Sequence, residues 1–416
     1  MNTSLRLRLW RVRLRETLVR LTLRAAFTLI APTPSIVAHG WRDGEENALQ
    51  IVRGLLATTR PGVPIVLLCE EPAVSARHLG IAIEGTVSER VSIVRKNSLR
   101  GLWLFVRARV AFSTHGMFCN PHAGRRRLHV LLGHGHGPKS ASNPLRPFLH
   151  GAHLATTNND VWGMAVIADQ GIDVARDAFT TGNPRDDVFT RPVDRSRLAA
   201  LGIDPAAPLL LWLPTYRVPR NEPKLTGLPE IGESAVLRDR IALLRDHARE
   251  RGVTVVTKAH QLDDQRNVEG WGFTVVTDHT LLDAGLSFFQ LLSLADGLVS
   301  DYSSVWVDYL ARSRPVGLVF ADDVEFARGR GFNSPAISEV AAELCIVSDE
   351  EMAVFVDAVV ASFATGAVAD ASSRVAERLA LRRGSGATRR VLEVVQTRMA
   401  EMGLPPLVDV RRMIGP

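Results

Sequence analysis

The stretch GLVSDYSSVWVDYLARS, residues 297–313, runs from a short apolar strand directly into a helix. The first turn of that helix carries Ser303 and Ser304. Short runs rich in Val, Ile and Leu that each precede a helical pattern are typical of parallel strands buried on both faces. The stretch therefore predicts one strand–helix unit of an α/β fold.

Similar units recur in two sets, on either side of a polar, proline-bearing stretch at 191–207. The first set comprises the runs 64–71, 91–96, 108–116 and 127–135, and the second comprises 208–217, 253–260, 273–279, 297–304 and 315–323. Strands and helices alternate in both sets, which predicts two doubly wound, Rossmann-like domains with a boundary near 190. The chain then ends in helical patterns.

Length and composition agree with two soluble domains. A chain of 416 residues is too long for one ordinary core, and 46% hydrophobic with 23% charged residues is typical of a globular protein. The three cysteines are scattered and form no C-x-x-C spacing. This pattern fits neither a disulfide framework nor a zinc ribbon, so we expect a reducing, cytoplasmic setting.

The net charge of +6 is concentrated at the start of the chain. Seven arginines and one glutamate in the first 24 residues account for the whole excess. Read as a helix, this segment has a narrow apolar stripe between arginines, formed by Leu7, Trp10, Leu14, Leu18, Leu21 and Ala25. Such a helix suits an anionic membrane interface. The apolar run at 25–31 is much shorter than the ~20 residues that a spanning helix needs.

Other interpretations of the basic segment remain open. It could be a disordered tail, it could rest on its own domain, or the Arg–Leu alternation at 5–9 could form a strand. A secretory signal fits poorly, because Pro32 and Pro34 interrupt its hydrophobic part. Nucleic-acid binding is the weaker alternative, since no basic patch interleaved with aromatic residues follows.

Polar residues follow several predicted strands, at the edge where open α/β sheets bind ligands. Those residues are His134, Thr215, Arg217, Lys258, His260, Ser303 and Ser304. Two hydroxyls beside unpaired backbone N–H groups favour a phosphate site, although a serine in this position is also the commonest helix cap. Likewise Lys258 and Arg217 could neutralise a diphosphate or simply be solvated surface charges.

The segment LLGHGHGPKS, residues 131–140, ends a strand with two histidines set between glycines. A metal site is the weaker interpretation, because Lys139 follows where a metal hydrolase would need Asp and His. A Walker loop is excluded by the order of the residues. The remaining choices are a histidine that takes a proton near a phosphate and a turn histidine with no chemical role.

Five motifs together resemble the CDP-glycerol:poly(glycerophosphate) glycerophosphotransferase family. They are HGHGPK (134–139), TGNPRDDVF (181–189), LPTYR (213–217), KAHQ (258–261) and the block from Leu298 to Phe332. Three segments depart from the family pattern. Gly133 replaces the usual tryptophan, His136-Gly137-Pro138 replaces Thr-Pro-Leu, and Lys258-Ala259-His260-Gln261 replaces Arg-Pro-His-Pro.

The resemblance implies a GT-B-like fold, in which two Rossmann-like domains face a cleft, and peripheral attachment to the inner membrane face. We therefore expect a basic amphipathic segment (1–30), an acceptor domain (31–190), a CDP-alcohol-binding domain (191–385) and a terminal helix (386–416). The expected reaction moves glycerol phosphate or ribitol phosphate from a CDP-alcohol to a hydroxyl of a lipid-linked saccharide or polyol-phosphate acceptor. Teichoic-acid-like or capsular polymers would be the product.

In this interpretation His134 is the catalytic base. The expected substrate-binding residues are Lys139, Arg185, Thr215, Arg217, Lys258, His260, Asp301, Ser303, Ser304 and Arg330. We expect no cofactor, no obligatory metal and no nucleic-acid partner. The alternatives are a GT-B glycosyltransferase that uses a nucleotide sugar, a metal-dependent hydrolase, and a non-catalytic membrane-bound partner of a polymerase.

Overall fold

Two parallel sheets form the frame of the protein. The structure is a computed structural model and describes residues 3–141, 149–215, 235–258, 271–320, 326 and 331–412. The N-terminal sheet has the strand order β3-β2-β1-β4-β5-β6-β7. Its strands are β1 (Thr33–His39), β2 (Ile65–Cys69), β3 (Val91–Arg95), β4 (Ala108–Ser113), β5 (Leu128–Leu131), β6 (Leu154–Thr157) and β7 (Ala178–Thr180).

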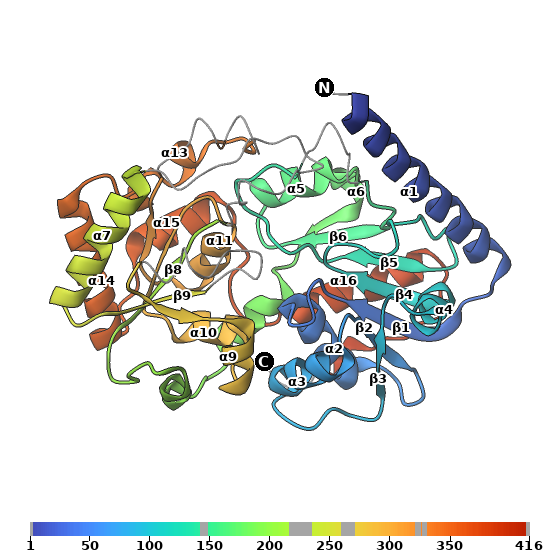
Figure 1. The fold of residues 1–416 in the computed structure, drawn as a ribbon. Helices are drawn as coiled ribbons and strands as arrows, with labels where there is room; N and C mark the ends of the chain where they lie inside the picture. Colours follow the sequence, from blue (N-terminus) through green and yellow to red (C-terminus); the bar gives the residue numbers. More distant parts are fainter. Residues whose placement is uncertain are drawn as a thin grey trace.

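The C-terminal sheet has the order β10-β9-β8-β11-β12, and it contains the stretch from which the fold was predicted. Its strands are β8 (Leu209–Leu213), β9 (Thr254–Lys258), β10 (Thr274–Val276), β11 (Gly297–Ser300) and β12 (Val316–Leu318). All neighbouring strands in both sheets are parallel. The two sheets lie side by side in Figure 1. The predicted boundary near 190 falls between β7 and β8.

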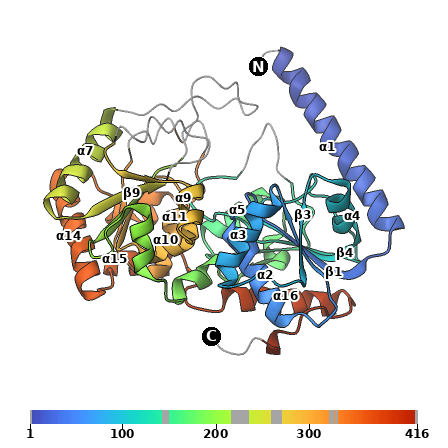
Figure 2. The same ribbon diagram turned by 60° about the horizontal axis from the view of Figure 1, so that its bottom comes forward.

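Helices cover both faces of the N-terminal sheet. One face packs on α2 (Glu46–Thr58), α3 (Pro72–Ile83) and α16 (Ala387–Glu401), and the other packs on α1 (Thr3–Leu29) and α4 (Leu99–Arg107). The helix α16 is the last long helix of the chain, yet Val391, Leu392 and Val395 belong to the N-terminal core. Figure 2 shows α16 next to α2 at the lower edge of the N-terminal domain.

The C-terminal sheet is covered in the same way. On one face lie α7 (Ala235–Glu250) and α14 (Asp349–Thr365), and on the other lie α10 (Phe288–Leu294), α11 (Val305–Tyr309) and α15 (Asp370–Arg378). The remaining helices are short: α5 (Trp162–Asp169), α6 (Val174–Asp177), α9 (Asp278–Asp283), α13 (Ile337–Val340), and the 3₁₀ turns η1 (Pro184–Thr190), η2 (Arg195–Leu201), η3 (Leu310–Arg312), η4 (Ala342–Leu344) and η5 (Val410–Arg412).

The helix α1 has two separate apolar faces. Leu23 and Phe27 are buried against the N-terminal domain, where the guanidinium of Arg127 lies over the Phe27 ring. Trp10, Leu14, Leu18 and Leu21 instead point into solvent and are 43–60% exposed. The alternative of a strand at 5–9 is wrong, because α1 is helical from Thr3. In the part of the chain that the structure describes, no single helix is long and apolar enough to cross a membrane.

Candidate active site where the two sheets meet

The loop that follows β5 contains His134 and is shaped by glycines. Gly133 has a φ of +66°, and a Cβ there would lie 2.4 Å from Nε2 of His136. Position 133 therefore admits only glycine, and the His136 ring occupies the space that a side chain at 133 would need. The two departures from the family pattern thus compensate each other in space.

The same loop touches the start of α11 in the C-terminal domain. A Cβ at Gly135 would lie 2.3 Å from Ser304 Oγ, and a Cβ at Gly137 would lie 2.8 Å from Ser304 Cα. His134 is therefore adjacent in sequence to a residue that contacts the serine pair. The polypeptide segments after β5 and β11, which belong to different sheets, converge as the strand-end rule requires.

His134 presents its side chain to solvent, with one face covered by another histidine. The rings of His115 and His134 are stacked, with centroids 3.6 Å apart and planes 20° from parallel. Lost hydration lowers the pKa of His134 well below 6.5, and its neighbours His115 and Arg185 act in the same direction. Because water still reaches this ring, the pKa of His134 is lowered less than full burial would lower it. A neutral imidazole of this kind can accept a proton.

The Arg185 side chain is buried, and its predicted role in binding substrate stays a prediction. Its side chain is 6% exposed and forms a 2.8 Å ion pair with Asp308 of α11. It also donates a 2.7 Å hydrogen bond to the carbonyl oxygen of His134, and Glu45 lies 3.6 Å away. Arg185 therefore ties the His134 loop to the C-terminal helix α11.

The buried carboxylate of Asp308 accepts two further hydrogen bonds. Asn158 and Asn183 each donate to its Oδ1 at 3.0 Å. Desolvation by burial raises the pKa of Asp308, while the neighbouring Arg185 lowers it. Buried charges are tolerated when they are paired and hydrogen-bonded, so this network joins the two halves through Asp308 and Arg185.

Asp301 is likewise buried, and its predicted role in binding substrate stays a prediction. It is fully shielded from solvent, and its Oδ1 accepts from the backbone N–H and the hydroxyl of Thr215, both at 2.6 Å. The Ser303 N–H also donates to this oxygen, at 3.3 Å. Asp301 thus links the ends of β8 and β11, and the Thr215 hydroxyl has its proton committed to Asp301 rather than to a ligand.

The remaining predicted ligands that are described lie around the serines. The side chain of Ser304 makes no cap hydrogen bond to α11, so a capping role does not account for it. The carbonyl oxygen of Lys139 accepts a 3.1 Å hydrogen bond from Asn333, which fixes the loop after His134. Lys258 forms a 2.8 Å ion pair with Asp278. Arg217, His260 and Arg330 lie outside the described residues.

The metal interpretation concerned the histidines between 115 and 153. Across the described ranges, no group of three His, Cys, Asp or Glu side chains is placed to hold a metal ion. Instead the His153 ring is hydrogen-bonded to the backbone. Its Nδ1 accepts from the His129 N–H at 3.0 Å, and its Nε2 donates to the Gly124 carbonyl at 2.9 Å.

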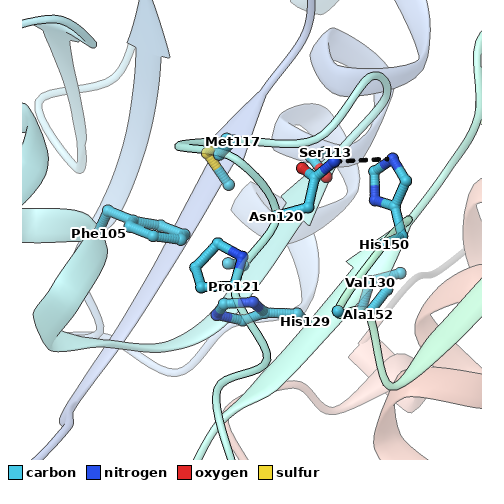
Figure 3. Close-up of a pocket in the computed structure, with 11 residues that line it drawn as sticks. Phe105, Ser113, Met117, Asn120, Pro121, His129, Val130, His150 and Ala152 are labelled. Atoms are coloured by element: carbon cyan, nitrogen blue, oxygen red, sulfur yellow. Dashed lines mark hydrogen bonds between the residues drawn. The ribbon is translucent and has the colours of Figure 1, made fainter. Parts of the chain in front are cut away.

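A small cavity lies beside these histidines and away from the serine pair. Figure 3 shows Asn120 bonded to His150 and the His129 ring at the cavity wall. Its volume is about 20 Å³, and the buried His129 Nε2 has no hydrogen-bond partner. The cavity has room for roughly one water molecule, not for a nucleotide.

Sequence reasoning missed His115 and Asp308. His115 comes two residues after β4, so the strand-end rule that selected His134 would have selected it too. The role of Asp308 had no such signal, because its partner Arg185 is 123 residues away in the chain.

A sequence model described as CDP-glycerol:poly(glycerophosphate) glycerophosphotransferase matches residues 164–394. No individual curated protein sequence matches the chain. A variant of the wall teichoic acid polymerase TagF has a similar structure, with a TM-score of 0.65 and 14% identity over 95% of this chain and 98% of that chain.

Two epimerases share the fold at lower similarity. A putative UDP-N-acetylglucosamine 2-epimerase from Listeria monocytogenes has a TM-score of 0.53 and 13% identity, over 91% of this chain and 99% of that chain. UDP-GlcNAc 2-epimerase from Neisseria meningitidis has a TM-score of 0.50 and 10% identity, over 87% and 99%. The predicted fold of two doubly wound, GT-B-like domains is therefore confirmed.

Proposed function

The chain belongs to the CDP-glycerol:poly(glycerophosphate) glycerophosphotransferase family, and on this basis we propose that it transfers a glycerol-phosphate or ribitol-phosphate unit from a CDP-alcohol to a hydroxyl of a lipid-linked acceptor. Membership of the family implies an enzyme with a CDP-glycerol-type donor and a polymer acceptor. The product would be a teichoic-acid-like or capsular polymer, and CMP would leave.

The observation that carries this proposal is the contact between the His134 loop and Ser304. His134 on one domain is the sequence neighbour of Gly135, and the Cβ position of Gly135 lies 2.3 Å from the Ser304 hydroxyl of the other domain. The lowered pKa of His134 keeps its imidazole neutral at pH 7. Transfer of a phosphoryl group needs positioning and charge neutralisation more than covalent catalysis, so such a junction suits it.

The proposed step is a nucleophilic substitution at phosphorus. The acceptor hydroxyl loses its proton to His134, and its oxygen forms a bond to the phosphorus that carries the polyol. The bond from that phosphorus to the bridging oxygen breaks, and CMP departs with the electron pair. Ser303 and Ser304 would hold the diphosphate, and Lys139 and Lys258 would supply positive charge.

Three predicted ligands outside the described residues keep that role as predictions: Arg217, His260 and Arg330. The substrate-binding roles of Asp301 and Arg185 also stay predictions. Their hydrogen bonds hold the ends of β8 and β11 and the His134 loop in place.

The direct test incubates the protein with CDP-glycerol, CDP-ribitol or a UDP-sugar, together with a lipid-linked disaccharide or a glycerol-phosphate-primed acceptor. CMP release with one CDP-alcohol, and loss of most of it in His134→Ala, are the expected results; removing a general base typically costs about 10²–10⁴-fold. Turnover of the UDP-sugar alone would indicate a glycosyltransferase instead. Unchanged CMP release in His134→Ala would remove that residue from the mechanism.

We further propose that α1 holds the protein on the cytoplasmic face of the membrane, as a peripheral protein. Its outward stripe of Trp10, Leu14, Leu18 and Leu21 is exposed, while the opposite face of the same helix is used for packing. Arginines flank the stripe. An apolar stripe between cationic side chains favours anionic lipid headgroups.

Co-sedimentation with vesicles tests this placement. Binding should require anionic lipid, weaken with added salt, and drop when Leu14 and Leu18 are both changed to Glu. Equal binding of that double variant would show that another surface is responsible.

A further inference from the structure

His115 stacks on the proposed base, His134. It lies directly after β4, and its ring covers one face of the His134 ring at a centroid separation of 3.6 Å. The two planes are only 20° apart, so the contact is a face-to-face stack. One side of the His134 imidazole is therefore closed to water by an uncharged aromatic surface.

Other groups hold His115 in that position. The Trp41 ring packs edge-on against it, with centroids 5.1 Å apart. The Thr114 hydroxyl lies 3.2 Å from His115 Nδ1 and also accepts the Trp41 N–H at 3.3 Å. The hydroxyl therefore still has its own proton and a second lone pair available for Nδ1, so it fixes the ring of His115 in either tautomer.

We propose that His115 is a positioning residue that fixes the orientation of the His134 ring and, by covering one face, keeps it in the neutral, proton-accepting form. This inference rests on the proposed role of His134. A ring that is stacked on one side loses hydration there, and lost hydration disfavours the charged imidazolium. An oriented base that is neutral at physiological pH is the form that transfer requires.

The surrounding charges act in the same direction. Burial lowers the pKa of His115 to about 3, so at neutral pH it covers His134 as an uncharged ring. Arg185 lies behind the loop and adds positive potential. The other titratable or charged groups that face the pair are His136 and Lys139 beside His134, and His39, His150 and Lys96 beside His115.

The first experiment does not depend on activity. In protein labelled at its histidine side chains, the His134 resonance is assigned from its absence in His134→Ala, and its titration is followed in wild type, His115→Ala and His115→Phe. We expect His115→Ala to move the His134 pKa up toward 6.5, because water gains access to the exposed face. His115→Phe keeps that face covered and should leave the pKa near the wild-type value.

The same three proteins are then assayed for CMP release. In His115→Ala, kcat should fall roughly 10- to 100-fold with little change in the KM for CDP-glycerol, and the acid limb of kcat/KM should move to higher pH. His115→Phe should recover most of the lost kcat. His122→Ala, an exposed histidine of the same domain, is the matched control and should behave as wild type.

Two results overturn the inference. One is a His115→Ala protein whose His134 titration and kcat both equal those of wild type. The other is a His115→Phe protein as impaired as the alanine variant, which would mean that the imidazole itself is needed and not its covering. Absence of CDP-alcohol turnover in wild type would instead refute the proposed function, and the titration would still decide whether His115 covers His134.

Discussion

Gly135 has no room for a methyl group, because a Cβ there would lie 2.3 Å from Ser304 Oγ. The Gly135→Ala substitution should therefore push the His134 loop away from α11 and lower kcat/KM about 100-fold, the loss associated with a misplacement of about 1 Å. Gly85→Ala is the control, since no atom lies within 4 Å of its Cβ position. Steady-state CMP release is measured for both variants. Equal losses of kcat/KM would refute a special steric requirement at Gly135.

Arg185 has a buried structural role that its sequence motif did not indicate. Its guanidinium is shared among Asp308, the His134 carbonyl and Glu45. Removing one partner of a buried ion pair leaves an uncompensated charge, which typically costs about 3–5 kcal/mol. Arg185→Met should lower the free energy of unfolding by that amount.

Urea denaturation measures this effect, and an exposed pair provides its control. Arg176 also binds an aspartate, Asp177, but its own side chain is 74% exposed. Arg176→Met should change the free energy of unfolding by less than about 1 kcal/mol. Similar midpoints for the two variants would contradict the structural role of Arg185.

The apolar residues of the helix α1 form two groups, one buried against the N-terminal domain and one exposed to solvent. Phe27 is 3% exposed and packs under Arg127, whereas Leu14 is 43% exposed. Phe27→Ala should cost about 3–5 kcal/mol of stability, as large core truncations do, and Leu14→Ala should cost almost nothing. Vesicle binding should show the opposite order. Thermal and urea unfolding measure the stability of both variants, and co-sedimentation measures their vesicle binding.

Sequence patterns predicted the elements unevenly. All five strands of the C-terminal sheet were predicted, because each is a short apolar run followed by a helical pattern. The central strand β1 was missed, because Pro34 breaks its apolar pattern. The structure accommodates that proline where the β1–β4 register shifts, between Thr33 and Ile36. Prolines are tolerated at such irregular strand starts.

The site was predicted in the same uneven way. Parallel strands end at one edge, so His134 and Ser304 could be brought together from sequence alone. The burial of Asp301 and Arg185 could not, because it depends on side chains 86 and 123 residues away. Local sequence patterns predict where a strand ends, whereas the hydrogen-bond partners of a side chain depend on the packed tertiary structure.

Over the whole molecule, six histidines make the N-terminal half sensitive to acid. Burial lowers their pKa values to about 3 or 4, and they are His39, His115, His129, His136, His150 and His153. Between pH 4 and 6.5 the unfolded chain binds protons that the native state does not, so stability rises with pH through this window. Glu45 opposes the trend, since burial raises its pKa to about 7.

Acidification from pH 7 to pH 5 should therefore destabilise the protein, with hydrogen exchange rising first around β1, β4 and β5. His39→Gln should make the dependence shallower by up to about 1.4 kcal/mol per pH unit, the contribution of one proton. Urea midpoints at several pH values measure the slope. A slope identical to wild type would show that His39 takes up its proton equally in both states.

The return of α16 to the N-terminal core has a practical consequence for anyone cutting this protein into pieces. A fragment that stops near residue 190 would leave bare the groove that Val391, Leu392 and Val395 fill, and it should aggregate when expressed by itself. Supplying the 387–401 peptide in trans, or grafting it by circular permutation, should restore a soluble half-molecule.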